Sequence, residues 1–128
     1  MKLLLDTHIL LWAADGTLPI SASGYILDES NDLFFSPASL WEVIIKRSLG
    51  RDDFDVNPHS LYNGLLDNGY TELPITAEHT LLIDSMLPIH KDPFDRILLA
   101  QAASCGMSLL TADSIAAEYP GSIILLRH

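Results

Sequence analysis

Four acidic residues stand at positions from which folding could bring them together: Asp6, Glu42, Asp95 and Asp113. Asp6 directly follows the apolar run 3–5, and Asp113 lies just past the apolar pair 109–110. If both runs are strands of a parallel sheet, these two acids lie at its carboxyl edge, where ligands bind in such folds. Glu42 and Asp95 fall in the first two turns of predicted helices whose N-termini lie at the same edge. We therefore expect the four carboxylates to converge.

Such a cluster predicts bound divalent cations. Two like charges ~4 Å apart repel by about 4 kcal/mol at an effective dielectric near 20, so four carboxylates stay ionised together only if cations compensate them. Oxygen ligands without a cysteine or histidine cluster favour Mg²⁺ or Mn²⁺. Divalent ions in an acidic cleft are typical of phosphodiester hydrolysis, because they activate water and stabilise the leaving oxygen.

Each acid also has a purely structural interpretation. Asp6 could cap the end of a strand, although a carboxylate is costly to bury unpaired. Glu42 could pair with Lys46 four residues along a helix, or complete a capping box. Asp95 and Asp113 could be first-turn or cap residues, which local N–H groups and the helix dipole stabilise. We favour a functional role for Asp6 and Glu42, whereas spacing alone does not decide for the other two.

Several residues near the acids are given structural roles. Asp92 precedes a proline and fits the N-cap of the helix that carries Asp95, where the helix dipole favours a carboxylate. The histidines at 8 and 90 flank the acids, but residues placed in this way are more often packing or hydrogen-bonding groups than ligands. Trp12 and Trp41 are predicted to be core or interface residues.

Basic residues are few but grouped. Five of the seven lie within about ten residues of Glu42 or Asp95: Lys46, Arg47, Arg51, Lys91 and Arg96. This placement suits phosphate contacts at the rim of a cleft. We expect Arg96 or Lys91 to steady a phosphate, with Lys46 as a further contact.

Composition limits the class of protein. The chain has 128 residues, 48 % of them hydrophobic, which is typical of one globular domain spanning residues 1–128. Its single cysteine, Cys105, allows no internal disulfide and indicates a reducing compartment. The net charge of −10 excludes a protein that holds nucleic acid by a bulk positive field. No targeting segment or membrane-spanning stretch is recognised, so we expect a cytoplasmic protein without membrane association.

Short apolar runs alternate with segments of helical period, which predicts a three-layer α/β domain with a mainly parallel central sheet of four to five strands flanked by helices. Caps and glycines set the helix limits, and residues 51–59 are interpreted as a surface loop. The predicted strands are 3–5, 33–35, 70–73, 109–110 and 123–126. The predicted helices are 7–14, 21–28, 37–49, 58–67, 76–86 and 93–105.

Four segments together resemble the PIN domain family, in particular the VapC type of toxin, in the family's order along essentially the whole chain. They are residues 4–8 (LLDTH, followed by Leu11 and Trp12), 36–42 (SPASLWE), 90–102 (HKDPFDRILLAQA) and 110–113 (LTAD). Any one of these motifs is weak evidence, but the set is highly specific.

The resemblance implies a Mg²⁺- or Mn²⁺-dependent endoribonuclease, the toxin of a type II toxin–antitoxin pair, usually a homodimer inhibited by its antitoxin. The family's acidic positions fall on the four acids named above, with Asp6 and Asp95 as direct metal ligands. Glu42 and Asp113 would complete the cluster and orient water, and Thr111 matches the hydroxyl beside the last acid. The chain is more acidic than expected for a broad RNA footprint, which favours a short, defined substrate loop.

Other classes fit less well. A receiver-type phosphorylation switch needs a paired acid after its first strand and a late lysine, and a haloacid-type phosphatase needs Asp-x-Asp; this chain has neither. A catalytically silent PIN-like binding module is the remaining alternative, although all four acids are present. We further expect the apolar helix at 9–14, with Trp12, to face a second subunit or the antitoxin. The antitoxin is expected to insert a basic side chain among the carboxylates.

Overall fold

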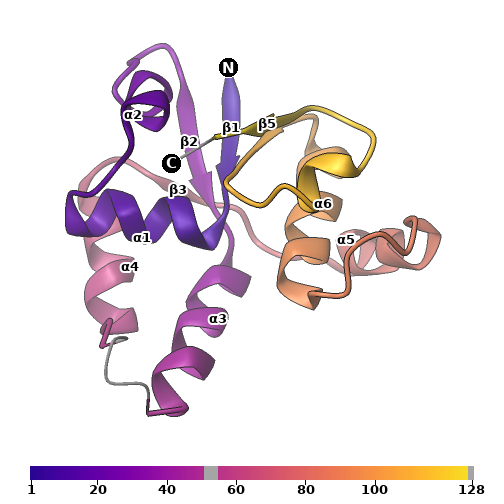
Figure 1. Ribbon diagram of the computed structural model, residues 1–128, viewed down its shortest axis with the longest axis horizontal. Coiled ribbons are helices and arrows are strands. Elements are labelled where there is room, and N and C mark those ends of the chain that lie inside the picture. The colour runs from indigo at the N-terminus through magenta and orange to yellow at the C-terminus, as the bar shows by residue number, and fades with distance from the viewer. Residues whose placement is uncertain (51–54, 127–128) are drawn as a thin grey trace.

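The computed structural model describes residues 1–50 and 55–126, within which five strands and six α-helices alternate along the chain (Figure 1). The first half contains β1 (Lys2–Leu5), α1 (Thr7–Asp15), α2 (Ile20–Ile26), β2 (Asp32–Phe35), α3 (Pro37–Ser48) and α4 (Pro58–Asp67). The second half contains β3 (Thr71–Glu72), α5 (Ala77–Leu82), α6 (Pro93–Cys105), β4 (Ser108–Thr111) and β5 (Ile123–Leu125). Two short 3₁₀ turns, η1 (Ile83–Ser85) and η2 (Ala116–Glu118), follow α5 and precede β5.

The strands form one parallel sheet in the order β3-β2-β1-β4-β5. The central strand, β1, pairs Leu4 with Phe34 of β2 and with Leu109 of β4. Because every pairing is parallel, the residues that follow β1, β2 and β4 all emerge at the carboxyl edge of the sheet. Helix α3 leaves the sheet at the edge to which the arrowheads of β1 and β2 point (Figure 1).

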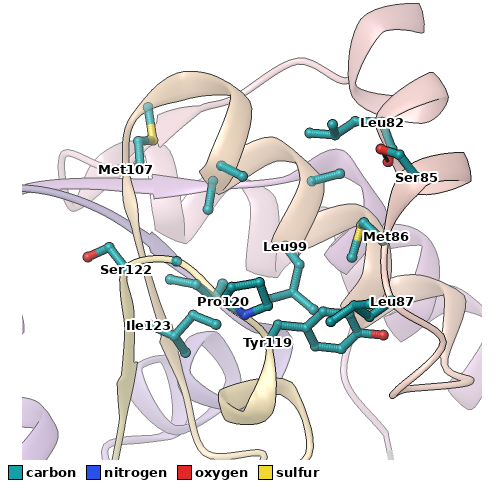
Figure 2. A pocket seen from close by; sticks show the side chains of 15 residues that line it. Leu82, Ser85, Met86, Leu87, Leu99, Met107, Tyr119, Pro120, Ser122 and Ile123 are labelled. Carbon is teal, nitrogen blue, oxygen red and sulfur yellow. Dashed lines mark hydrogen bonds between the residues drawn. The ribbon is translucent and has the colours of Figure 1, made fainter.

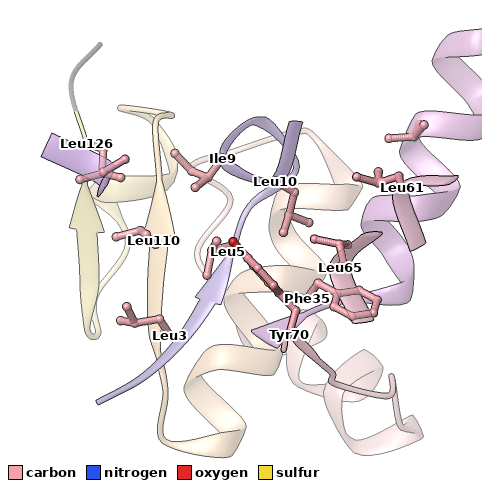
Figure 3. Close-up of a cluster of buried hydrophobic side chains, with 12 residues drawn as sticks. Leu3, Leu5, Ile9, Leu10, Phe35, Leu61, Leu65, Tyr70, Leu110 and Leu126 are labelled. Carbon is pink, nitrogen blue, oxygen red and sulfur yellow. The ribbon is translucent and has the colours of Figure 1, made fainter. Parts of the chain in front are cut away.

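Alternation along the strands gives the sheet two hydrophobic faces, which explains why the strands are apolar at successive positions. Leu3 and Leu5 belong to a core cluster with buried residues of α1, α2, α3 and α4 (Figure 3). Leu4 lies on the opposite face, in a second cluster with Leu98 and Leu99 of α6. Helices on both faces of a parallel sheet make the three-layer α/β fold that the sequence predicts.

Local capping explains where most helices begin. The side chains of Ser36, Asn57, Thr76 and Asp92 each accept a backbone N–H in the first turn of the helix that follows, and all four helices begin within one residue of the predicted start. At the other end of α6, Gly106 adopts φ 65°, the left-handed conformation that glycine reaches without strain.

The predicted helix 76–86 is wrong at its C-terminal end. The α-helix α5 stops at Leu82, and the next three residues form η1. There the N–H of Met86 bonds to the carbonyl of Ile83, which is the shorter 3₁₀ spacing. Pro88 follows and disfavours helical backbone at the residue before it. The predicted loop 51–59 is also shortened, because α4 already begins at Pro58, while residues 51–54 lie outside the described residues.

Within the described ranges, every helix is too short or too polar to cross a membrane.

Leu110 sits in the middle of the sheet with no exposed surface, so its truncation tests the core. We predict that Leu110→Ala lowers the free energy of unfolding by about 2–5 kcal/mol, because a cavity replaces packed side-chain atoms. Urea denaturation measures this change. Ile20→Ala, at a side chain that is 92 % exposed, is the matched control and should shift the midpoint little. Equal effects in the two variants would contradict the packing described above.

Candidate metal centre

Asp6 joins the ends of the two central strands. It follows β1 and caps α1, with Oδ1 accepting the N–H of Ile9 at 2.9 Å. Its Oδ2 accepts the hydroxyl of Thr111 at 2.5 Å and the N–H of Ala112 at 3.1 Å, both at the end of β4. Only 4 % of the residue is exposed. Burial raises the pKa of the Asp6 carboxyl, and these three hydrogen bonds to the ionised form oppose the rise.

Asp113 divides its two carboxylate oxygens between a turn and the site. Oδ1 accepts the N–H groups of Ile115 and Ala116 at 2.8 and 3.3 Å, which begins η2. Oδ2 lies 2.8 Å from Nε2 of His90. Partial burial raises the pKa of Asp113, but the hydrogen bond with His90 and the two backbone N–H groups lower it more, so the pKa is below its usual value.

Asp95 lies in the first turn of α6, with Oδ2 2.9 Å from the same Nε2 of His90. Its pKa is raised to about 7, first because the carboxyl is buried and then because the negative charges of Asp92 and Asp113 face it. The charge of Asp6 raises it further, while His90 opposes the rise. The Asp95 carboxyl therefore lies where negative charge is not fully compensated.

His90 lies between these two carboxylates, and hydrogen bonds of its backbone N–H and of its ring fix its position. Its N–H donates to the hydroxyl of Tyr119 at 2.8 Å, and its Nδ1 accepts the N–H of Asp92 at 3.2 Å. Because Nδ1 is an acceptor, the proton of the neutral ring is on Nε2, the atom that faces both acids. Burial lowers the pKa of His90, but the hydrogen bond to Asp113 and the nearby negative charges raise it above its usual value.

Sequence reasoning expected a hydrogen-bonding role for His90, and this is confirmed, but it did not place the ring inside the site. The available signal was its position two residues before the cap of α6, within the motif at 90–102. The ligand atoms of His90, Asp95 and Asp113 all lie within 4.8 Å of one another. In the part of the chain that the structure describes, Asp6 and Glu42 fall outside this group.

Glu42 lies in the second turn of α3, and its carboxylate is 3.2 Å from Nζ of Lys46. The helical pair that the sequence offered as an alternative is therefore formed. A buried hydrogen bond at 2.9 Å, from the hydroxyl of Thr7 to that of Ser39, joins the first turns of α1 and α3. This contact, which sequence reasoning missed, draws the start of α3 towards the residues that follow β1.

The basic residues are largely engaged with other groups of the protein. Nη2 of Arg96 donates to the carbonyl of Ile83 at 3.1 Å, and Lys46 is paired with Glu42. Arg47 lies 3.7 Å from a carboxylate oxygen of Asp55. Lys91 is exposed at the start of the 90–102 motif, and Arg51 lies outside the described residues. The predicted phosphate contacts of Arg96 and Lys46 thus compete with internal partners.

The donor set fits a divalent cation. Asp95 and Asp113 offer carboxylate oxygens within a small volume, and Nε2 of His90 would become a ligand only by giving up its proton, while Asp6 adds charge beside them. Such oxygen-rich sets suit Mg²⁺ or Mn²⁺, and imidazole is also a ligand of transition metals. The grouping of these acids supports the fit, because a cation would supply the positive charge that the site lacks.

An apolar pocket of about 250 Å³ lies elsewhere, between α6, η1 and the segment that leads into β5. Figure 2 shows Leu99, Met86 and Tyr119 among the side chains that line it. The four acids predicted from the sequence are not part of this lining. Tyr119 connects the two places, because its ring lines the pocket and its hydroxyl holds the backbone of His90.

With this geometry in view, comparison with known families is decisive. The model of the PIN domain matches residues 3–121. The chain belongs to the PIN domain family. The family resemblance of the four sequence motifs is thereby confirmed. A search of curated proteins finds no match.

Solved structures share the fold of this PIN domain. The VapBC2 complex of Rickettsia felis, bound to a DNA fragment from its promoter, has 19 % identity and a TM-score of 0.72, covering 99 % of this chain and 98 % of that one. DNA-bound VapBC of Salmonella typhimurium has 16 % identity and a TM-score of 0.71 at the same coverage. VapC20 of Mycobacterium tuberculosis, described as a toxin that cleaves the sarcin-ricin loop, has 15 % identity and a TM-score of 0.62, covering 92 % and 96 %.

The hydrogen bond from Thr111 to Asp6 can be tested by removing only the hydroxyl. We predict that Thr111→Val lowers the free energy of unfolding by about 1–3 kcal/mol near pH 7, because a buried charged acceptor loses a donor. Since burial raises the folded pKa of Asp6, the acid becomes protonated as the pH falls, and the bond to the ionised form is lost. The difference from the unmodified protein should therefore shrink in acid.

Urea denaturation at several pH values measures the effect of Thr111→Val. Thr111→Ser, which keeps the hydroxyl, is the matched control and should retain most of the stability. A valine variant as stable as the unmodified protein would contradict the contribution predicted for the hydrogen bond.

Proposed function

We propose that this PIN domain is a divalent-metal-dependent endoribonuclease and the toxin component of a type II toxin–antitoxin pair. The observation that carries the proposal is the grouping of His90, Asp95 and Asp113 at the carboxyl edge, where Asp6 also follows β1. The similar fold of VapC20, whose name describes RNA cleavage, supports the choice of RNA as the substrate.

Mg²⁺ or Mn²⁺ is the proposed cofactor, with Asp6 and Asp95 as the main ligands and Asp113 beside them. A divalent cation supplies Lewis-acid activation of water and stabilisation of the charge that develops on the leaving oxygen. The chain's own residues hold this site ready. Thr111 donates to Oδ2 of Asp6, and the Nε2 proton of His90 lies between the oxygens of Asp95 and Asp113.

Glu42 is proposed to complete the acidic set by orienting water, with Lys46 holding its carboxylate. Lys91, which is exposed, is the better placed of the two predicted phosphate contacts of the 90–102 motif, since Arg96 is bonded to Ile83. Asp92 caps α6 through one oxygen and adds negative charge near Asp95. In this proposal Asp92 supports the site without binding metal directly.

An antitoxin is the proposed protein partner, and a homodimer the proposed assembly. The fold is shared with VapBC complexes, in which a partner protein is present. The charge of the acidic cluster complements a basic side chain of the antitoxin. Trp12 is half-buried against the core of its own chain, so the part of α1 that remains exposed would form any contact with a partner. A toxin that acts on RNA would work in the cytoplasm.

Two substitutions test the catalytic proposal. We predict that Asp6→Asn and Asp95→Asn each lower the rate of RNA cleavage by roughly 10²-fold or more, because each removes a charge that holds the cation. Cleavage of a structured RNA is measured with Mg²⁺ or Mn²⁺ and again with EDTA, which should abolish it. Circular dichroism checks that the fold is kept.

Asp32→Asn is the matched control, since this exposed acid lies at the start of β2, at the opposite edge of the sheet. It should cleave at the unmodified rate. Full cleavage by either site variant would contradict the roles proposed for Asp6 and Asp95. No metal-dependent cleavage by the unmodified chain would instead support the alternative of a catalytically silent binding module.

Metal affinity should depend on pH through Asp95. Because its pKa is raised to about 7, a proton competes with the cation below that value. Protonation of His90, whose pKa is also raised, acts in the same direction. Mn²⁺ affinity is therefore predicted to rise by about tenfold per pH unit for each competing proton well below pH 7, less steeply as the pH approaches 7, and to level off above it. Isothermal titration calorimetry measures this dependence, and Asp95→Asn should bind more weakly with a smaller slope. Constant affinity across this range would contradict the predicted competition.

A further inference from the structure

Two aromatic side chains lie beside the acidic site without belonging to either core cluster. Trp41 of α3 is 62 % exposed, although tryptophan is usually mostly buried. Its ring centroid is 5.3 Å from that of Phe94, in the first turn of α6, and the ring planes meet at 80°. The pair therefore bridges the N-terminal turns of two helices that both begin at the carboxyl edge of the sheet.

The geometry of this pair leaves a flat surface open. In an edge-to-face contact, one ring turns only its rim to the other, so Phe94 covers at most one face of the indole. The contact also fixes the plane of the indole, which reduces the side-chain freedom that a ligand would have to remove. Each ring directly precedes a proposed site acid, Trp41 before Glu42 and Phe94 before Asp95. Because Phe94 lies in the first turn of α6 together with Asp95, the ring pair lies at the same edge of the sheet as the carboxylates.

The charge of the chain makes such a surface useful. A net charge of −10 opposes binding of a polyanion, and Lys46, Arg47 and Arg96 already have internal partners. Phosphate contacts from the described residues can therefore supply little of the affinity. Stacking of a base on an aromatic ring needs no positive charge, because it acts on the uncharged face of the base. It also requires a base that is free of its helix, as in a single-stranded loop.

We propose that Trp41, held by Phe94, is a stacking platform for one unpaired RNA base next to the acidic site. This inference rests on the proposed ribonuclease function and specifies the form of its substrate. A base stacked on the indole anchors the strand beside the carboxylates, so that affinity comes from the base while the acidic cluster acts on the backbone. The ligand is thus single-stranded RNA, and duplex RNA, whose bases are stacked on each other, is bound poorly.

The test compares two RNA probes in the Asp95→Asn background, which prevents cleavage. One is a short oligoadenylate, and the other is an abasic oligomer of equal length, which keeps the phosphates and removes the bases. Fluorescence anisotropy measures the Kd of each. Trp41→Ala should raise the Kd for oligoadenylate by on the order of tenfold and leave that for the abasic oligomer unchanged. Trp41→Phe, which keeps an aromatic face, should restore most of the binding.

Ile44→Ala is the matched control, because this side chain is 48 % exposed and lies one turn further along α3. It should change neither Kd, and thermal melting checks that all variants fold. Equal binding of the two probes, or equal loss of both in Trp41→Ala, would overturn the platform. Sedimentation gives a second overturning outcome: a shift of oligomeric state by both Trp41→Ala and Ile44→Ala would assign this surface to contact between copies of the chain.

Cleavage by the otherwise unmodified chain separates this inference from the proposed function. Trp41→Ala should raise KM for a hairpin with a single-stranded loop by about the same factor as Kd and change kcat little. Metal-dependent cleavage that is unaffected by Trp41→Ala would overturn the platform alone. Absence of cleavage in the unmodified chain would overturn the ribonuclease function, whatever the binding result.

Discussion

Negative charge concentrated at one edge of a parallel sheet is the constraint on which this structure depends. β1 lies between β2 and β4, so the acids that follow β1 and β4 emerge together. Neutral donors hold them there: the hydroxyl of Thr111 and backbone N–H groups for Asp6, and the first-turn N–H groups of η2 for Asp113. These dipoles stabilise the carboxylates but add no net charge. Burial and the negative charges of Asp92 and Asp113 raise the pKa of Asp95, and a divalent cation is the natural complement.

The acids combine two roles that sequence reasoning treated as alternatives. Asp6 uses one oxygen to cap α1 and the other to reach the end of β4. Asp113 uses one oxygen to begin η2 and the other to face His90. A carboxylate held in this way has few rotamers left, so the positions of its oxygens are fixed before any ligand arrives. Capping thus contributes to the preorganisation of the site rather than competing with it.

The basic residues show the opposite behaviour, since their grouping in sequence did not translate into a positive surface. Lys46 and Arg47 bond to acids of their own neighbourhood, and Arg96 reaches back to η1. Two rings lie at the same edge of the sheet, Trp41, which is exposed, and Phe94 beside it. In the proposed function, recognition of RNA by such a surface would depend on the metal for the phosphates and on the rings for the bases.

Much of the fold was readable from the chain alone. The apolar runs located all five strands, the caps Ser36, Thr76 and Asp92 located three helix starts, and the place of Asp6 and Asp113 after strands put both at one edge. These features are local, because periodicity, capping and strand direction act within a few residues. Other features depend on contacts between distant residues. His90 bonds to Asp113 and to Tyr119, and Thr7 bonds to Ser39, across 23 to 32 residues of sequence. His90 also contacts Asp95, in the first turn of α6. Such contacts exist only once the helices pack on the sheet, since packing and not spacing sets the direction of each side chain.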